Sequence, residues 1–300
     1  MTNQLGSPLP VKKGVSPNSL WLKEGNWATM LEYFLDRFPH IDRKNCEKRF
    51  SRGEVVTEQG EVLKCSSPYQ ANIRIYFYRE LENEIAIPFQ EEIIFQDNNI
   101  IVVDKPHFLP VAPSGHYLQE TLIVRLRNKL KIDTIELCHR LDKETAGIVL
   151  LTKNIESRAA YQSLFAERKI EKRYLAVASN SSLDFPLVRR SLIVEGEPFP
   201  RMMESIGEPN SETHIKQLQI GEKKSLYELR PITGKKHQLR VHMAAIGIPI
   251  YNDPLYPKLK IKQTNDFRLP LQLLAKSIKF VDPLDGKEKC FTSRQELTLT

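Results

Sequence analysis

The sequence has few cysteines, no long apolar run and no metal-binding motif, and each absence excludes a class of protein. The cysteines lie far apart and form no CxxC pair, which argues against a zinc site or a disulfide framework: they are Cys46, Cys65, Cys138 and Cys290. No apolar stretch approaches the roughly 20 residues of a membrane-spanning helix, and residues 1–10 lack an apolar signal core. Neither HExxH nor a similar ligand cluster occurs. We therefore expect a cytoplasmic protein that holds no metal and needs no cofactor.

The charge balance is the first positive feature. The 300 residues carry a formal net charge of +7 and a sequence pI of about 9.1, while 41% are hydrophobic and 27% charged, as in ordinary globular proteins. A basic balance favours a polyanionic partner, RNA or DNA first. The basic residues gather in three runs: Arg125, Arg127, Lys129 and Lys131; Arg168, Lys169, Lys172 and Arg173; Lys235, Lys236 and Arg240. Each run is consistent with phosphate contacts and also with a solvated face.

The first part of the chain predicts a small separate module. Residues 1–18 contain Pro and Gly without periodicity, which predicts a flexible arm. The apolar spacing over 29–38 predicts an amphipathic helix, and the alternation over 72–79 predicts a strand. The acidic segment 81–89 indicates a linker. We therefore divide the chain into residues 1–88 and residues 89–300.

The rest of the chain mixes strands and helices without strict alternation, which favours an α+β fold over a doubly wound α/β fold. Asn154 is the expected cap of one helix, with Ala159, Leu164 and Phe165 turned inward, and Gly247 ends another. Helices are predicted over 118–130, 155–169 and 236–246. Strands are predicted over 92–96 and 100–104 as a hairpin, then over 146–152, 174–178, 225–230 and, last along the chain, 271–280.

One carboxylate stands out in the second part. Asp142 follows His139 and Arg140 and precedes a Thr-Ala-Gly turn, after which an almost unbroken apolar strand begins. This context presents a single acid at the edge of a buried sheet, where catalytic groups are common. A plain turn-capping Asp fits the same spacing.

Four blocks of the sequence stand out within roughly residues 91–280: Glu92–Pro106, His139–Gly147, Lys172–Val177 and Leu229–His242. Together, and in this order, they resemble one family, the RluA-type RNA pseudouridine synthases. The resemblance implies that the chain isomerises uridine in RNA, on an α+β fold whose mixed, mostly antiparallel central sheet is flanked by helices. A small N-terminal module precedes it. Residues 45–64 are similar to a degenerate S4-type RNA-binding module, and also fit a helical lead-in with a hairpin.

The resemblance also assigns roles to individual residues. It makes Asp142 the essential carboxylate, which either attacks the ribose or removes a ribose proton. It makes Arg240 the cation that keeps Asp142 ionised. Tyr174 is expected to stack on the uracil and later to take the C5 proton. Arg140 is expected to contact RNA near the position that the flipped nucleotide leaves.

The other candidates for substrate binding complete the expected site. They are His139, Thr145, Lys235, His237 and Gln238; His139 is not expected to act as an acid or base. On residue type alone, Arg240 fits an ordinary helix-surface Arg, Tyr174 a half-buried strand Tyr and Arg140 a salt bridge within its loop.

Two departures from the family pattern weaken any assignment to a subfamily: Ala146 stands where many members have Ser, and Leu274 where some have His. The alternative function is a non-catalytic RNA-binding protein on the same fold, and a metal-dependent nuclease is a weaker one. We expect a monomer acting on ribosomal RNA, transfer RNA or both.

Overall fold

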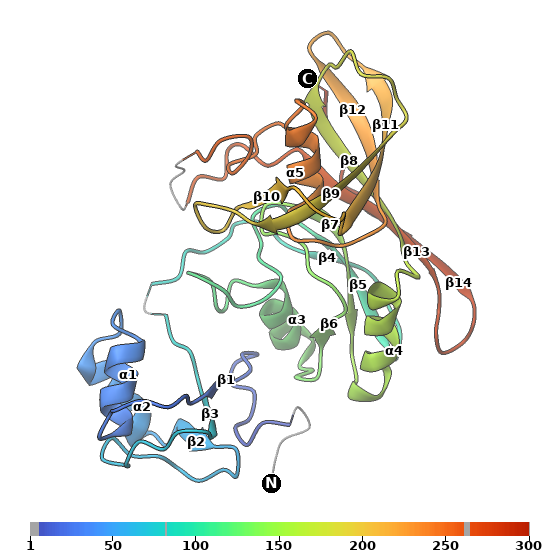
Figure 1. The fold of residues 1–300 in the computed structure, drawn as a ribbon. Helices are drawn as coiled ribbons and strands as arrows, with labels where there is room; N and C mark the ends of the chain where they lie inside the picture. The colour runs from blue at the N-terminus through green and yellow to red at the C-terminus, as the bar shows by residue number, and fades with distance from the viewer. Residues whose placement is uncertain (1–5, 82, 261–264, 300) are drawn as a thin grey trace. The chain divides into compact units, whose positions relative to one another are not determined.

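The computed structural model describes residues 6–81, 83–260 and 265–299, which fall into two compact units (Figure 1). The first unit comprises Met1–Glu84, Pro113–Gln119 and Val124–Thr134. The second unit comprises Ile85–Ala112, Glu120–Ile123 and Ile135–Thr300. Among the described residues, no helix has the length and apolar character that crossing a membrane requires.

The first unit contains a three-stranded antiparallel sheet, two helices of its own and most of a third helix, α3 (Leu122–Leu130). The strands, in sheet order, are β1 (Asn18–Trp21), β3 (Arg74–Phe77) and β2 (Val55–Thr57), and the helices are α1 (Met30–Arg37) and α2 (Arg43–Ser51). Thr29 caps α1 by accepting a hydrogen bond from the Glu32 N–H, while the Glu32 carboxylate accepts from the Ala28 N–H. The predicted helix over 29–38 and strand over 72–79 are therefore confirmed, the strand in shortened form.

The predicted flexible arm is wrong for residues 6–18, while residues 1–5 lie outside the described part of the chain. Leu9 is buried and packs in one cluster with Val56, Tyr76 and Tyr78. The Tyr78 hydroxyl donates to the Pro10 carbonyl at 2.6 Å. Sequence periodicity missed this segment because it is held by single side chains rather than by a regular element.

The second unit is built on one 11-stranded sheet, mostly antiparallel, with helices packed on it (Figure 1). The strand order is β10-β9-β11-β12-β8-β13-β7-β5-β4, with β14 beside β13 and β6 beside β7. The strands are β4 (Glu92–Gln96), β5 (Ile100–Lys105), β6 (Glu136–Leu137), β7 (Ala146–Thr152), β8 (Glu171–Ser179), β9 (Leu187–Glu195), β10 (Met202–Ser205), β11 (Ser211–Ile220), β12 (Lys224–Pro231), β13 (Leu273–Val281) and β14 (Glu288–Thr292). The α+β prediction with a mixed, mostly antiparallel sheet is confirmed.

The helices differ from the predictions mainly at their ends. After α1 and α2, the helices along the chain are α3 (Leu122–Leu130), α4 (Ile155–Ala166) and α5 (Gln238–Ala245). Asn154 caps α4 as predicted by accepting from the Ser157 N–H, but Ala159 is exposed, and Ser157, Tyr161 and Leu164 are the buried positions. The helix predicted from residue 236 begins two residues later because His237 has a left-handed backbone, with φ of 55°.

Several strands were not predicted. β9, β10, β11 and β14 are absent from the sequence-based prediction, so the strand over 271–280 is not the last one. Their exposed and buried residues alternate, as in β9 and β14, but few of the inward side chains are large and apolar. These strands form because β9 pairs with β11 and β13 pairs with β14. The local sequence does not predict this pairing.

One row of residues across four strands fixes the geometry at the start of β7. Gly147 lies opposite Lys105 of β5 on one side and Ala275 of β13 on the other, and Ala275 in turn lies opposite Tyr174 of β8. A Cβ atom on Gly147 would stand 2.2 Å from the Ala275 carbonyl oxygen, and the φ of Gly147 is +110°. Only glycine therefore permits this parallel contact between β7 and β13.

Gly147→Ala is expected to destabilise the protein by more than about 2 kcal/mol, because steric overlap with backbone adds to an unfavourable φ. The control is Gly286→Ala, whose φ is +71° but whose Cβ would meet nothing within 4 Å. Urea titration of both variants measures the difference. Equal midpoints for the two variants would show that the contact with Ala275 does not constrain position 147.

Candidate active site

The predicted carboxylate and the predicted cation lie together. Asp142 is in the loop between β6 and β7, and Arg240 is on α5, 98 residues later. The Arg240 Nη1 donates to the Asp142 Oδ2 at 2.9 Å. The Arg240 side chain is 1% exposed and that of Asp142 is 26% exposed. Among the described residues, the Asp142 Oδ1 has no bonding partner, so one oxygen of the carboxylate is anchored and the other is open.

A second carboxylate, Asp253, holds the other edge of the Arg240 guanidinium. Its two oxygens accept from the Arg240 Nε and Nη2, each at 2.8 Å, and its side chain is fully buried. A bidentate pair of this kind fixes the plane of the guanidinium as well as its charge. Although burial disfavours a charged guanidinium, the bonds and charge of Asp253 and the charge of Asp142 raise the pKa of Arg240. Sequence reasoning gave Asp253 no role.

These contacts keep Asp142 ionised. Burial raises the pKa of its carboxyl, but the charge of Arg240, then His237, the Arg240 hydrogen bond and Lys105 outweigh burial, so the net pKa is lowered. The loop itself is a tight turn in which the Thr145 N–H donates to the Asp142 carbonyl at 3.1 Å. Thr145, which was predicted to bind substrate, is itself buried, and its link to Asp142 runs through the backbone.

Lys105 holds the turn that carries Asp142. This fully buried lysine donates to the carbonyl oxygens of Pro106, Leu109 and Lys143, at 3.0, 2.9 and 3.2 Å. All three ammonium protons are thereby satisfied. Burial is the main cause that lowers the pKa of Lys105 to about 7, against the opposing charges of Glu144 and Asp142. The residue lies within the first of the four motif blocks, but no role was predicted for it.

Tyr174 is half-buried on β8, in the row that includes Gly147. Burial, followed by the charge of Asp142, raises the pKa of its hydroxyl. That hydroxyl makes no hydrogen bond to any residue that the structure describes. The phenol is therefore protonated and unengaged in the free protein, within the electrostatic reach of Asp142.

The predicted substrate-binding residues fall into two groups. Arg140 and Lys235 are exposed, and no ion pair or side-chain hydrogen bond engages either within the described part of the chain. His139 is engaged: its ring stacks on Phe165 with centroids 4.3 Å apart, and its Nε2 accepts from the Leu150 N–H. Burial lowers the pKa of His139 to about 3, so the ring is neutral. A direct contact of His139 with RNA stays a prediction.

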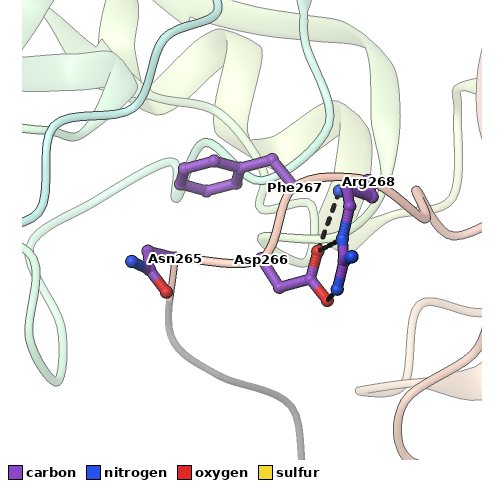
Figure 2. A pocket seen from close by; sticks show the side chains of 4 residues that line it. All are labelled: Asn265, Asp266, Phe267 and Arg268. Carbon is purple, nitrogen blue, oxygen red and sulfur yellow. Dashed lines mark hydrogen bonds and ion pairs between the residues drawn. The ribbon is translucent and has the colours of Figure 1, made fainter.

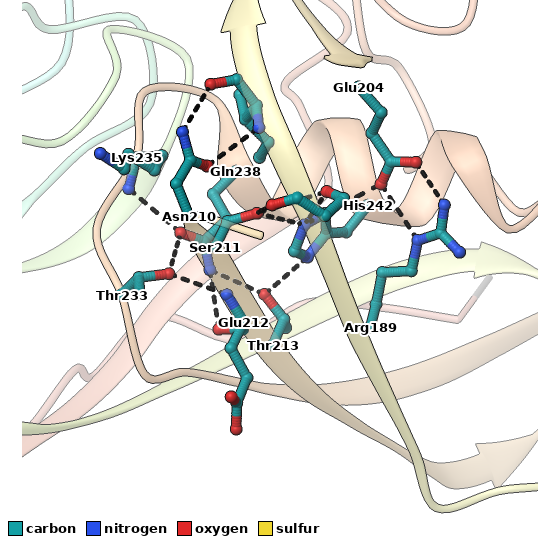
Figure 3. A network of polar contacts seen from close by, with 12 residues as sticks. Arg189, Glu204, Asn210, Ser211, Glu212, Thr213, Thr233, Lys235, Gln238 and His242 are labelled. Atoms are coloured by element: carbon teal, nitrogen blue, oxygen red, sulfur yellow. Dashed lines mark hydrogen bonds and ion pairs between the residues drawn. The ribbon is translucent and has the colours of Figure 1, made fainter. Parts of the chain in front are cut away.

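Gln238 organises the loop before α5. Its amide oxygen accepts from the Thr233 hydroxyl and the Lys235 N–H, and its amide nitrogen donates to the Glu212 carbonyl and the Thr213 hydroxyl. Figure 3 shows this amide pointing from α5 toward β11. Every polar atom of the amide is bonded within the protein, so Gln238 supports the loop, and a contact of Gln238 with RNA stays a prediction.

The two histidines of α5 and its cap face different surroundings. His237 Nδ1 lies 3.0 Å from the Tyr256 hydroxyl, and its Nε2 lies 3.9 Å from the Asp142 Oδ2. His242 instead joins the polar network of Figure 3, with Nδ1 against the Thr213 hydroxyl and Nε2 against the Ser211 hydroxyl. Burial lowers the pKa of His242 to about 4, so the His242 ring in this network is uncharged at neutral pH. Only His237 belongs to the Asp142 site.

A shallow pocket elsewhere contains none of the predicted residues. It is lined by Asn265, Asp266, Phe267 and Arg268 (Figure 2). The side chains of Asp266 and Arg268 pair through two hydrogen bonds, and the Phe267 ring packs on Phe89 and Phe108. The candidate active site is therefore the Asp142 cluster.

Comparison with known proteins identifies the family. Residues 99–245 match the family model described as RNA pseudouridylate synthase. A ribosomal large subunit pseudouridine synthase D of Zymomonas mobilis is 29% identical over 291 residues, covering 87% of this chain and 90% of that protein. The chain belongs to the RluA-type RNA pseudouridine synthases. The match includes Asp142, Tyr174 and Arg240 in one block of sequence.

Other relatives agree with this assignment. A mitochondrial tRNA pseudouridine(32) synthase of Saccharomyces cerevisiae is 33% identical over 176 residues, covering 55% of this chain and 37% of that protein. The structure of human RNA pseudouridylate synthase domain containing 4 superposes with a TM-score of 0.55 and 27% identity, over 69% of this chain and 88% of that one. The chain is therefore an enzyme, an RNA isomerase, and the alternative of a non-catalytic RNA-binding protein is rejected.

Proposed function

We propose that this pseudouridine synthase isomerises specific uridines in ribosomal RNA, transfer RNA or both, with Asp142 as its essential carboxylate. The names of the relatives from Z. mobilis and S. cerevisiae support these two RNA classes. The observation that carries the role of Asp142 is its asymmetry: Arg240 binds Oδ2, and none of the residues that the structure describes binds Oδ1. An ionised, oriented carboxylate with one open oxygen suits both attack on the ribose and removal of a ribose proton.

The remaining groups support that carboxylate. The reaction breaks the N-glycosidic bond, turns the uracil and rejoins it through carbon, so no redox group or donor is consumed. We propose that Tyr174 stacks on the uracil, because its ring is half-buried and its hydroxyl bonds to no side chain or backbone group in the described part of the chain. Its raised pKa keeps the phenol protonated in the free enzyme. Uptake of the C5 proton by Tyr174 would therefore require the bound nucleotide to lower that pKa.

Mapping pseudouridines in cellular RNA tests the proposed substrates. Total ribosomal and transfer RNA would be compared from cells with the gene, without it, and with a copy encoding Asp142→Asn. We expect one or a few positions to lose pseudouridine without the gene and to regain it only with the wild-type copy. Unchanged modification of both RNA classes would refute the proposal.

The exposed cations beside the site are the proposed phosphate contacts. Arg140, Lys235 and Lys236 are exposed, and Lys236 lies over the exposed Phe199 ring at 5.1 Å. The basic runs predicted from sequence are only partly available for RNA. Arg127 is buried and donates to the Gly14 carbonyl and Ser16 hydroxyl. The following charges are also engaged within the protein: Lys172 with the Thr233 carbonyl, Arg173 with Glu228, and Lys169 with Glu167.

RNA affinity is expected to fall steeply with salt, because phosphate contacts release counterions. Neutralisation of about three phosphates, by Arg140, Lys235 and Lys236, gives a slope of roughly −2 to −3 in a plot of log K against log salt. Lys235→Gln should reduce the slope by about 1. Lys279→Gln removes the same charge from a lysine paired with Glu288 and serves as the control. A flat salt response, or equal slopes for the two variants, would exclude Lys235 from the phosphate contacts.

We also propose that residues 1–88 form an accessory RNA-binding module before a catalytic domain of residues 89–300, and that the enzyme works as a cytoplasmic monomer. Support for a monomer comes from the site itself, since Asp142, Arg240, Asp253 and His237 all come from one chain. Light scattering during gel filtration, with and without RNA, measures the oligomeric state.

A further inference from the structure

One short turn after α5 supplies two groups to the site. Asn252 has a left-handed backbone, with φ of 61°, and the Asp253 Oδ1 accepts from the N–H groups of Leu255 and Tyr256 at 2.8 and 3.1 Å. Asp253 reaches Arg240 from this turn, as described above. Tyr256, three residues later, is buried and directs its hydroxyl at His237. The turn therefore touches the two residues whose side chains lie beside the Asp142 carboxylate, Arg240 and His237.

The Tyr256 hydroxyl has one proton and two possible acceptors. The Met202 N–H donates to this oxygen at 2.7 Å. The hydroxyl in turn lies 3.1 Å from the Met202 carbonyl and 3.0 Å from the His237 Nδ1. Burial is the main cause that raises the pKa of Tyr256, so the proton stays on the phenol. Where that proton points decides which nitrogen of His237 carries hydrogen.

The far edge of the His237 ring faces a negative charge. Burial lowers the pKa of His237, so the ring is neutral and has a single N–H. Its Nε2 lies 3.9 Å from the Asp142 Oδ2, and the charged groups that act on it are Asp142, Arg240, Lys236 and Asp253. An N–H directed at a carboxylate is attracted, whereas a lone pair is repelled. The arrangement therefore favours hydrogen on Nε2 and an acceptor at Nδ1.

We propose that Tyr256 is a positioning residue whose hydroxyl donates to the His237 Nδ1 and so holds His237 in the tautomer that directs Nε2–H toward Asp142. This N–H then faces the anchored Asp142 Oδ2 and is available to a substrate oxygen bound beside the carboxylate. The role deepens the proposed function and rests on it. A tautomer set by a hydrogen bond on the opposite nitrogen is a general way to orient imidazole groups.

The Tyr256 ring has a separate function that a conservative variant preserves. The guanidinium carbons of Arg240 and Arg201 lie 5.5 and 5.3 Å from the ring centroid. Tyr256→Phe keeps this ring and removes only the hydroxyl, so it isolates the bond to His237. The matched control is Tyr161→Phe. Tyr161 is also buried and donates to Asp282 at 2.8 Å, outside the Asp142 site.

The first test uses the protein alone and does not depend on its substrate. Nitrogen-15 resonances of the histidine rings distinguish protonated from unprotonated nitrogens, and the spectrum of His237→Asn assigns the His237 signals among the seven histidines. Asn is chosen because it tolerates the left-handed backbone at position 237. We expect Nε2–H in the wild type and in Tyr161→Phe, with a substantial Nδ1–H population in Tyr256→Phe. An Nδ1–H wild type, or an unchanged Tyr256→Phe, would overturn the proposal.

The second test asks whether the hydroxyl acts through His237. Tyr256→Phe is expected to lower the single-turnover rate about tenfold with unchanged RNA affinity. In the His237→Asn background the same change should cost less than about twofold, since neighbouring groups that act together are not additive. An equal loss in both backgrounds would mean that Tyr256 acts by another route. Inactivity of the wild type on every RNA tested would contradict the proposed function, while the nitrogen spectra would still decide the tautomer.

Discussion

Asp142→Asn is expected to lower the single-turnover rate at least about 10³-fold, which is the largest effect that any substitution in this chain should have. An amide is neither a nucleophile toward the ribose nor a base for its protons, so both proposed roles of Asp142 are lost together. The geometry should survive, because Asn retains an oxygen that can accept from the Arg240 Nη1.

The same variant should fold at least as well as the wild type. Arg240 is one cation between two carboxylates, and Asp253 alone still occupies its Nε and Nη2 after Asp142 is neutralised. Functional groups of this kind are commonly held at some cost to stability. We therefore expect an unchanged or higher melting temperature and RNA affinity close to wild type.

A buried carboxylate in another ion pair provides the control for Asp142→Asn. Asp282 is buried in the same unit and binds Lys289 and Tyr161. Asp282→Asn should lower stability while the rate per folded molecule stays near wild type. Turnover by Asp142→Asn within tenfold of wild type would remove Asp142 from the essential role.

The sequence predicted correctly those helices and strands that are determined by an apolar pattern or a cap within one short stretch of residues. The apolar run of β7 and the Asn154 cap of α4 were identified at the residues where the structure has them. The start of α5 was misplaced because the left-handed His237 interrupts a pattern that otherwise reads as helix. The strands β9 and β11 were missed because their pairing with each other, not their own composition, makes them strands.

In the candidate site too, the motif blocks predicted which residues meet, whereas the residues that support them were missed. Asp142 and Arg240 were predicted to meet, although 98 residues separate them, because the motif blocks resembled one family. Asp253, Lys105 and Tyr256 were missed as supports. Their roles arise only when the fold brings together the end of β5, the helix α5 and the turn at residues 252–256. No single stretch of sequence contains this information. Asp253 within an Asn-Asp-Pro turn, shortly after the Arg-bearing helix, was the available signal.

Arg240→Met is expected to lower the rate at neutral pH by about 10² to 10³-fold and to move the acid limb of the pH–rate profile upward by about 1 to 3 pH units. In the wild type, burial raises the pKa of Asp142, and Arg240 is the first of the groups that reverse this. Without the guanidinium, the largest contribution that opposes burial is lost. Asp142 then stays protonated to higher pH, so the deficit should be larger at pH 6 than at pH 8.

Loss of Arg240 also leaves Asp253 buried without its partner, which typically costs about 3 to 5 kcal/mol. The double variant Arg240→Met with Asp253→Asn removes that anion and keeps an oxygen for the N–H groups of Leu255 and Tyr256. It should recover stability but not activity. Arg189→Met, which breaks the bidentate pair with Glu204, is the matched control and should leave the pH profile unchanged.

Arg240→Lys separates charge from geometry. An ammonium supplies the positive charge but lacks the planar fork that binds Asp253 with two hydrogen bonds and Asp142 with a third. The acid limb of Arg240→Lys should therefore lie near that of the wild type, because Asp142 still has a cation beside it. Its plateau rate should lie between those of Arg240→Met and the wild type, because the carboxylate is no longer fixed in one orientation. Single-turnover rates from pH 5 to pH 9 decide the point: a wild-type rate and an unshifted limb for Arg240→Met would show that Arg240 neither ionises nor orients Asp142.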